Sequence, residues 1–144
     1  MTGTATRGAA WAARLHGPLA AAGVVLAGFA LVAVVDPNEP GHYPTCPFLA
    51  LTGLYCPGCG SLRAAHALTR GDVATSAGDN ILFTLGLPLA VLLWGRWLYV
   101  RAKGRPAPVL PAPGTRPALW VAGLAVLVLF GVVRNLPWGA FLAP

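Results

Sequence analysis

Hydrophobic residues are concentrated in three long runs, and short polar or turn-rich segments separate them. The runs cover residues 18–35, 81–100 and 118–136. A helix rises about 1.5 Å per residue, so each run approaches the thickness of a hydrocarbon core of about 30 Å. The pattern predicts an all-α integral membrane protein with three transmembrane helices. Its 144 residues form a single membrane domain, in which residues 36–80 connect the first two spans.

The first hydrophobic run has the position of a signal peptide. Arg7 and Arg14 precede it, as positive charges precede the apolar core of such a peptide. The run is longer than that core, however, and no small-x-small cleavage site follows. The turn-rich segment Asp36-Pro-Asn-Glu-Pro follows instead. We therefore expect an uncleaved membrane helix that ends at these prolines.

The loop between the first two spans contains one short helical pattern. It begins at Ser61, and Gly71 is placed to end it. Arg63, His66 and Arg70 fall on one side at helical spacing. We expect an interfacial helix in which Arg63 and Arg70 contact lipid phosphates or a partner. The opposite, apolar side comprises Leu62, Ala65, Leu68 and Thr69.

Three further residues predict where the following helices start and bend. Asp72 is a good N-cap for the turn after Gly71, and Asn80 is a candidate N-cap for the second span. Pro88 lies inside that span, where its ring predicts a kink. Trp94, near the end of the same span, is typical of an interfacial aromatic belt.

Composition supports a membrane location. Hydrophobic residues make up 56% of the chain and charged residues only 10%. A soluble domain has about 25% charged residues, so this chain could not cover a water-facing surface with charge. The net charge of +6 could suggest nucleic acid, but the basic residues flank the apolar runs. We therefore expect the lipid bilayer and a membrane-protein partner, and no nucleic acid.

The distribution of Lys and Arg predicts the orientation. Arg7 and Arg14 precede the first span, and four basic residues lie in the linker between the second and third spans. In the first loop, acidic residues offset Arg63 and Arg70. The positive-inside rule thus places the N-terminus and the linker in the cytoplasm of a multi-pass cell-membrane protein. The cysteine loop and the C-terminus face outward. The basic linker residues are Arg101, Lys103, Arg105 and Arg116.

All three cysteines lie in the first loop. Cys56 and Cys59 are part of the tight turn Cys-Pro-Gly-Cys-Gly, and Cys46 lies ten residues before Cys56. Two thiolates at C-x2-C spacing can bind one side of a tetrahedral zinc ion. Cys46 would be the third ligand, and His42 or His66 the fourth.

The same cysteines permit two other kinds of chemistry. Cys56 and Cys59 could exchange as a redox pair, although the usual thioredoxin-like βαβ context is absent. In an oxidising compartment, a structural disulfide could instead join Cys46 to Cys56 or Cys59, or Cys56 to Cys59. A structural role, metal binding and redox chemistry all remain open at this point.

The cysteine segment resembles a known family of small bacterial membrane proteins, the domain of unknown function 2752. The resemblance implies a membrane protein and brings no established activity. We expect a non-enzymatic accessory or scaffold protein. The alternative is a membrane thiol oxidoreductase or zinc-dependent enzyme that uses the cysteines and His66. The resemblance is carried by Cys46, Pro47, Phe48, Thr52, Gly53, the turn Cys56 to Gly60, Arg63, Ala64, Gly71, Asp72 and Asn80.

Overall fold

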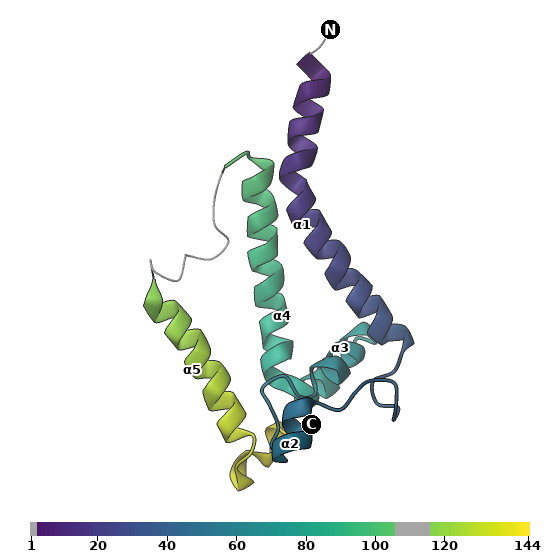
Figure 1. Cartoon of the computed structure of the whole chain (residues 1–144), viewed down its shortest axis with the longest axis vertical. Coiled ribbons are helices and arrows are strands. Elements are labelled where there is room, and N and C mark those ends of the chain that lie inside the picture. The colour runs from purple at the N-terminus through teal and green to yellow at the C-terminus, as the bar shows by residue number, and fades with distance from the viewer. Residues whose placement is uncertain (1–2, 106–115) are drawn as a thin grey trace.

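A computed structural model describes residues 3–105 and 116–144, and these residues form helices without any strand (Figure 1). This confirms the predicted all-helical class. The elements in chain order are α1 (Gly3–Val34), α2 (Pro47–Thr52), α3 (Ser61–Thr69), α4 (Val73–Ala102), α5 (Pro117–Val133) and the 3-10 helix η1 (Pro137–Leu142).

Two of the helices are long and apolar enough to cross a membrane. The apolar stretches are Trp11–Val34 in α1 and all of Val73–Ala102 in α4. The shorter helix α5 is also apolar, with 17 residues. α1 begins well before the expected start at Pro18, which lies inside the helix. Ala12 and Ala13, strong helix formers, extend the helix on the N-terminal side of this proline.

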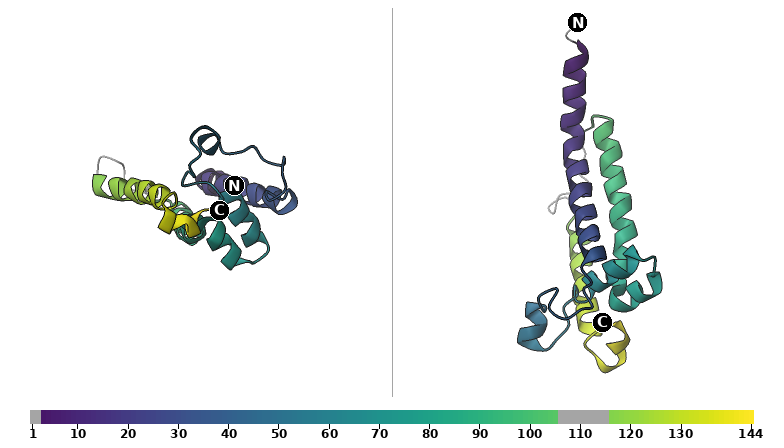
Figure 2. Two further views of the ribbon diagram at one scale, coloured as in Figure 1. Left: turned by 90° about the horizontal axis from the view of Figure 1, so that it is seen from below. Right: turned by 90° about the vertical axis from the view of Figure 1, so that its right-hand side faces the viewer.

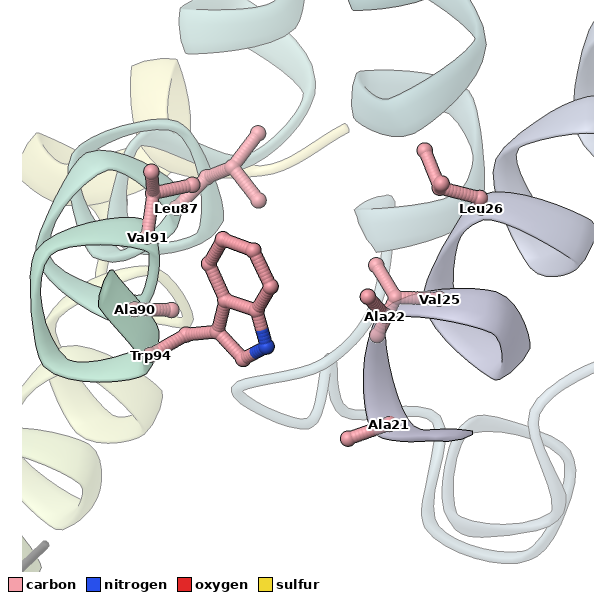
Figure 3. Close-up of a pocket in the computed structure, with 8 residues that line it drawn as sticks. All are labelled: Ala21, Ala22, Val25, Leu26, Leu87, Ala90, Val91 and Trp94. Atoms are coloured by element: carbon pink, nitrogen blue, oxygen red, sulfur yellow. The ribbon is translucent and has the colours of Figure 1, made fainter. Parts of the chain in front are cut away.

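The helices α1 and α4 pack through two tryptophans of α4. The indole N–H of Trp94 donates to the Pro18 carbonyl oxygen at 2.9 Å. Trp97 lies against Gly17, where an added Cβ would come within 3.4 Å of its ring. Trp94 therefore faces α1 rather than serving only as a belt residue. Its ring borders an apolar cavity of about 270 Å³ between Val25 and Leu26 of α1 and Val91 of α4 (Figure 3).

α4 consists of two helical segments that meet at Asn80. The Asn80 backbone has φ −161° and ψ 96°, which is not helical. Its side-chain oxygen accepts the Phe83 N–H at 3.0 Å, so Asn80 caps the second segment as predicted. Asp72 caps the first segment by accepting the Thr75 N–H at 2.9 Å. The interruption is thus at Asn80 and not at Pro88, where the backbone stays helical.

Helix α3 packs against both α4 and α1, and its orientation differs from the predicted one. His66 is buried at 5% exposure, whereas Leu62 is 47% exposed. The histidine is tolerated inside because both ring nitrogens have partners. Nδ1 donates to the Val32 carbonyl oxygen at 2.6 Å, and Nε2 lies 3.5 Å from an Asp36 carboxylate oxygen. His66 therefore connects α3 to the end of α1 instead of belonging to an exposed basic side.

The non-spanning elements gather at one end of the molecule. Figures 1 and 2 show α2, α3 and η1 beside the C-terminal ends of α1 and α5 and the start of α4. The start of α1 and the end of α4 lie at the opposite end. In Figure 1, α5 diverges from α4 toward its N-terminal end. The cysteine loop therefore lies at the end of the molecule where the short helices gather.

Candidate metal centre

The three cysteine sulfurs converge at this end of the molecule. The Sγ of Cys56 lies 3.1 Å from the Sγ of Cys59 and 3.5 Å from the Sγ of Cys46. All three sulfurs lie within 4.8 Å of one another. They are free thiols, and no pair is at the distance of a disulfide bond. This spacing would allow all three to contact one metal ion.

Local sequence explains how the turn brings Cys56 and Cys59 together. The Cys59 N–H donates to the Cys56 carbonyl oxygen at 3.0 Å, which closes the turn over Pro57 and Gly58. Gly60 follows with φ +84°, a left-handed conformation that favours glycine, and it precedes the first residue of α3. A Cβ at Gly60 would also collide with the Asp79 carbonyl oxygen. Both requirements demand glycine at this position.

The third cysteine comes from a separate element. Cys46 occupies the N-cap position of α2, directly before Pro47. Pro47 is favoured at the first position of a helix, because that position has no intrahelical use for an N–H group. α2 exposes Phe48 and Leu51 at its surface. Cys46 and Cys56 are half-buried and Cys59 is buried, so the cluster is partly accessible.

Asn80 binds the cysteine turn from within α4. Its side-chain N–H group donates to the carbonyl oxygens of Pro57 at 2.9 Å and Cys59 at 3.0 Å. The same group lies 3.2 Å from the Ser61 hydroxyl, while the amide oxygen caps α4. Asn80 is 1% exposed. One buried amide thus fixes both the turn and the break in α4.

Arg134 and Asn135 bind the same turn from the end of α5. Nη1 of Arg134 donates to the carbonyl oxygens of Cys56 at 2.8 Å and Cys59 at 3.1 Å. Asn135 accepts the Tyr55 N–H at 2.8 Å and donates to the Tyr55 carbonyl oxygen at 2.8 Å. Sequence analysis did not identify either residue as part of the site. The available signal was an Arg-Asn pair near the end of the last apolar run, which resembles an ordinary end of a membrane helix.

Electrostatic surroundings distinguish the cysteines from one another. The backbone N–H of Leu49 and the neighbouring Cys56 thiol lower the pKa of Cys46 to about 7. Burial raises the pKa of Cys59 to about 12, and the Cys56 thiol acts in the same direction. Cys46 is therefore the thiol of this pair that ionises first. A bound metal ion would deprotonate its thiol ligands outright.

The predicted histidine ligands lie apart from the cysteine cluster. His42 Nδ1 lies 2.9 Å from the Asp36 carbonyl oxygen, and its Nε2 lies 3.3 Å from a Glu39 carboxylate oxygen. The two ring nitrogens of His66 contact the Val32 carbonyl oxygen and the Asp36 carboxylate, as described above. Within residues 3–105 and 116–144, the group of potential ligands around the sulfurs consists of the three cysteines alone. Cysteine ligands are therefore brought together and histidine ligands are not.

The two arginines assigned to lipid or partner contact occupy different surroundings. Arg63 Nε lies 3.6 Å from an Asp79 carboxylate oxygen, so it is partly engaged within the protein. Arg70 is exposed at the end of α3. Of the two, Arg70 presents the more accessible positive charge.

These features define a helical protein with candidate membrane spans and a cluster of three thiols at one end. Residues 46–94 match the sequence model of a family described as "Protein of unknown function (DUF2752)", which confirms the resemblance seen in the cysteine segment. The matched segment contains the three cysteines and Asn80, but neither Arg134 nor Asn135. No curated protein and no solved structure matches the chain.

Proposed function

We propose that this chain is a three-span membrane accessory protein that binds one zinc ion through Cys46, Cys56 and Cys59. The observation that carries the proposal is the convergence of the three sulfurs within 4.8 Å on a turn bound by buried side chains. Thiolates are preferred ligands of Zn²⁺, which takes four ligands in a tetrahedral arrangement. His42 and His66 are occupied elsewhere, so this chain supplies three of the four.

The open fourth position suits an accessory role. A ligand from a membrane partner would complete the tetrahedron and attach that partner to the outward face. Cys46 and Cys56 are half-buried, so the cluster retains an accessible side. The rigid turn supports a scaffold function because its carbonyl groups are bound by Asn80 and Arg134.

The proposed membrane arrangement has α1, α4 and α5 as spans. Support comes from their apolar composition and from the Lys and Arg distribution. In this arrangement the N-terminus and the α4–α5 linker are cytoplasmic, and the cysteine cluster faces outward. Arg70, with a smaller contribution from Arg63, contacts lipid phosphates or the partner near that face.

Metal analysis combined with thiol counting tests the zinc assignment. The full chain, purified in detergent under reducing conditions, should contain about one zinc per chain and show protected thiols. A chelator should remove the zinc and expose all three cysteines to alkylation. Cys46→Ser, Cys56→Ser and Cys59→Ser should each reduce zinc content, while Thr45→Ser serves as a matched control beside Cys46. Three reactive thiols and no zinc before chelation would exclude the assignment.

The second candidate function is thiol–disulfide exchange, favoured by the 3.1 Å separation of the Cys56 and Cys59 sulfurs. In that reaction Cys56 and Cys59 would become a disulfide. Two electrons and two protons would pass to a partner disulfide, which would become two thiols. A parallel purification without reductant separates the candidates. A Cys56–Cys59 bond in zinc-free protein, found by mass spectrometry of the non-reduced sample, would favour exchange.

A further inference from the structure

Arg134 carries a buried positive charge. When the cysteines are neutral thiols, no negatively charged group of the described residues pairs with it. The side chain is 1% exposed. In the part of the chain that the structure describes, its guanidinium forms no ion pair with a carboxylate. Its Nε and Nη2 atoms are buried without a hydrogen-bond partner. Buried charges are normally paired, because removing an ion from water costs far more than burying a neutral group.

The groups that face this charge are aromatic rings and cysteines. The guanidinium carbon lies 4.9 Å from the centre of the Phe130 ring and 5.8 Å from that of Tyr55. Cys56 and Cys59 act on it electrostatically, and their carbonyl oxygens accept its Nη1 hydrogen bonds. The rings attract the cation, but by less than the cost of burying an unpaired charge. The cysteine cluster is therefore the available source of compensating negative charge.

We infer that Arg134 is the charge partner of a divalent metal site formed by the three cysteines. Three thiolates and one divalent ion leave one net negative charge, and one guanidinium neutralises it. The loaded site is then neutral overall, and the buried arginine gains its missing counter-charge. This inference rests on the proposed metal binding and adds Arg134 as a residue that favours a trithiolate–divalent complex without being a ligand.

Substitution of Arg134 gives the first test. In the full chain in detergent, Zn²⁺ affinity is measured by competition with a chelating indicator. Arg134→Gln should weaken binding by about 10- to 100-fold, the usual effect of losing a residue just outside the ligand shell. Arg70→Gln removes an exposed positive charge as a control. Asn135→Ala removes hydrogen bonds to the cysteine segment without changing charge.

A charge-swap variant separates electrostatics from support of the turn. Cys46→His keeps a zinc ligand but removes one negative charge, so it should weaken binding while Arg134 is present. In the Arg134→Gln background, two thiolates and a neutral imidazole balance the ion, so Cys46→His should strengthen binding. Arg134→Lys keeps the charge and should respond to Cys46→His as the wild type does. A merely structural Arg134 would not reverse the sign of this response.

The outcomes decide between the claims. The inference is overturned if Arg134→Gln and Asn135→Ala weaken zinc binding equally and Cys46→His weakens it by the same factor with Arg134 or Gln at position 134. That result would leave the zinc site itself intact. Absence of zinc from the wild type overturns both. If Arg134→Gln does not fold by circular dichroism, Cys46→Asp replaces it. Aspartate preserves the negative charge and should bind zinc more tightly than Cys46→His, and the reverse order would contradict the inference.

Discussion

Asn80 lies at the interruption of α4, and its side-chain N–H donates to the Cys59 carbonyl oxygen at 3.0 Å. The same side chain caps the second segment of α4 through Phe83. One residue therefore both supports the cysteine turn and caps the second segment of α4. A change at Asn80 should affect both.

Asn80→Ala should lower the free energy of unfolding by at least about 2 kcal/mol. Buried carbonyl oxygens of Pro57 and Cys59 would lose their donor, which costs about 1–3 kcal/mol, and α4 would lose an N-cap. Denaturant unfolding in detergent micelles measures the change. Asn38→Ala is the control, since Asn38 is exposed and hydrogen-bonds only to Asp36 nearby in the chain. Equal effects of the two substitutions would contradict the role assigned to Asn80.

Gly60→Ala should be more destabilising than Gly71→Ala. Both glycines have positive φ, +84° and +76°, so alanine at either costs about 1–2 kcal/mol in backbone strain. Only at Gly60 would the new Cβ meet the Asp79 carbonyl oxygen, and nothing lies within 4 Å at Gly71. Melting temperatures of the two variants provide the comparison. Similar values would show that the chain relaxes around Gly60.

In metal-free, reduced protein, the cysteines should differ in the pH at which they become reactive toward an alkylating reagent. The pKa of Cys46 is lowered to about 7, so its reactive thiolate forms as pH rises through neutrality. The pKa of Cys59 is raised to about 12, so it should remain a slowly reacting thiol up to strongly alkaline pH. Timed iodoacetamide labelling with peptide mass spectrometry gives each rate. Faster labelling of Cys59 than of Cys46 at pH 8 would disprove the ordering.

Reporter fusions should reveal an alternating topology. A reporter active only after export should be inactive when fused after Gly104 and active when fused after Pro144. The expectation follows from the basic residues around the α4–α5 linker and from the three apolar helices. A cytoplasm-dependent reporter at the same two positions is the matched control. Export activity at Gly104 would overturn the proposed orientation.

Sequence patterns predicted the features that depend on neighbouring residues. Asp72 and Asn80 were identified as N-caps because capping requires only a suitable side chain two or three residues before its donor. The bounds of α3 were predicted well for the same reason, with Ser61 as its first residue and Gly71 shortly after its end. Hydropathy located the apolar helices because it sums over many residues.

Long-range contacts were not predictable in this way. Arg134 contacts Cys56 across 78 residues, and nothing adjacent to either residue indicates the other. His66 has the spacing of a solvent-facing residue, but partners from α1 and Asp36 allow it to be buried. Trp94 similarly finds its partner in Pro18, 76 residues away. These outcomes depend on which helices meet, and a periodic pattern does not contain that information.

The contacts that Arg134 and Asn135 make with the cysteine segment can form only after α5 has been synthesised. Synthesis proceeds from the N-terminus, so Tyr55, Cys56 and Cys59 emerge 75–80 residues before their partners on α5. Until α5 has been synthesised and has docked, the turn is bound by Asn80 alone among these side chains. Its final shape is therefore a late product of biogenesis, acquired only after the last long helix is in place.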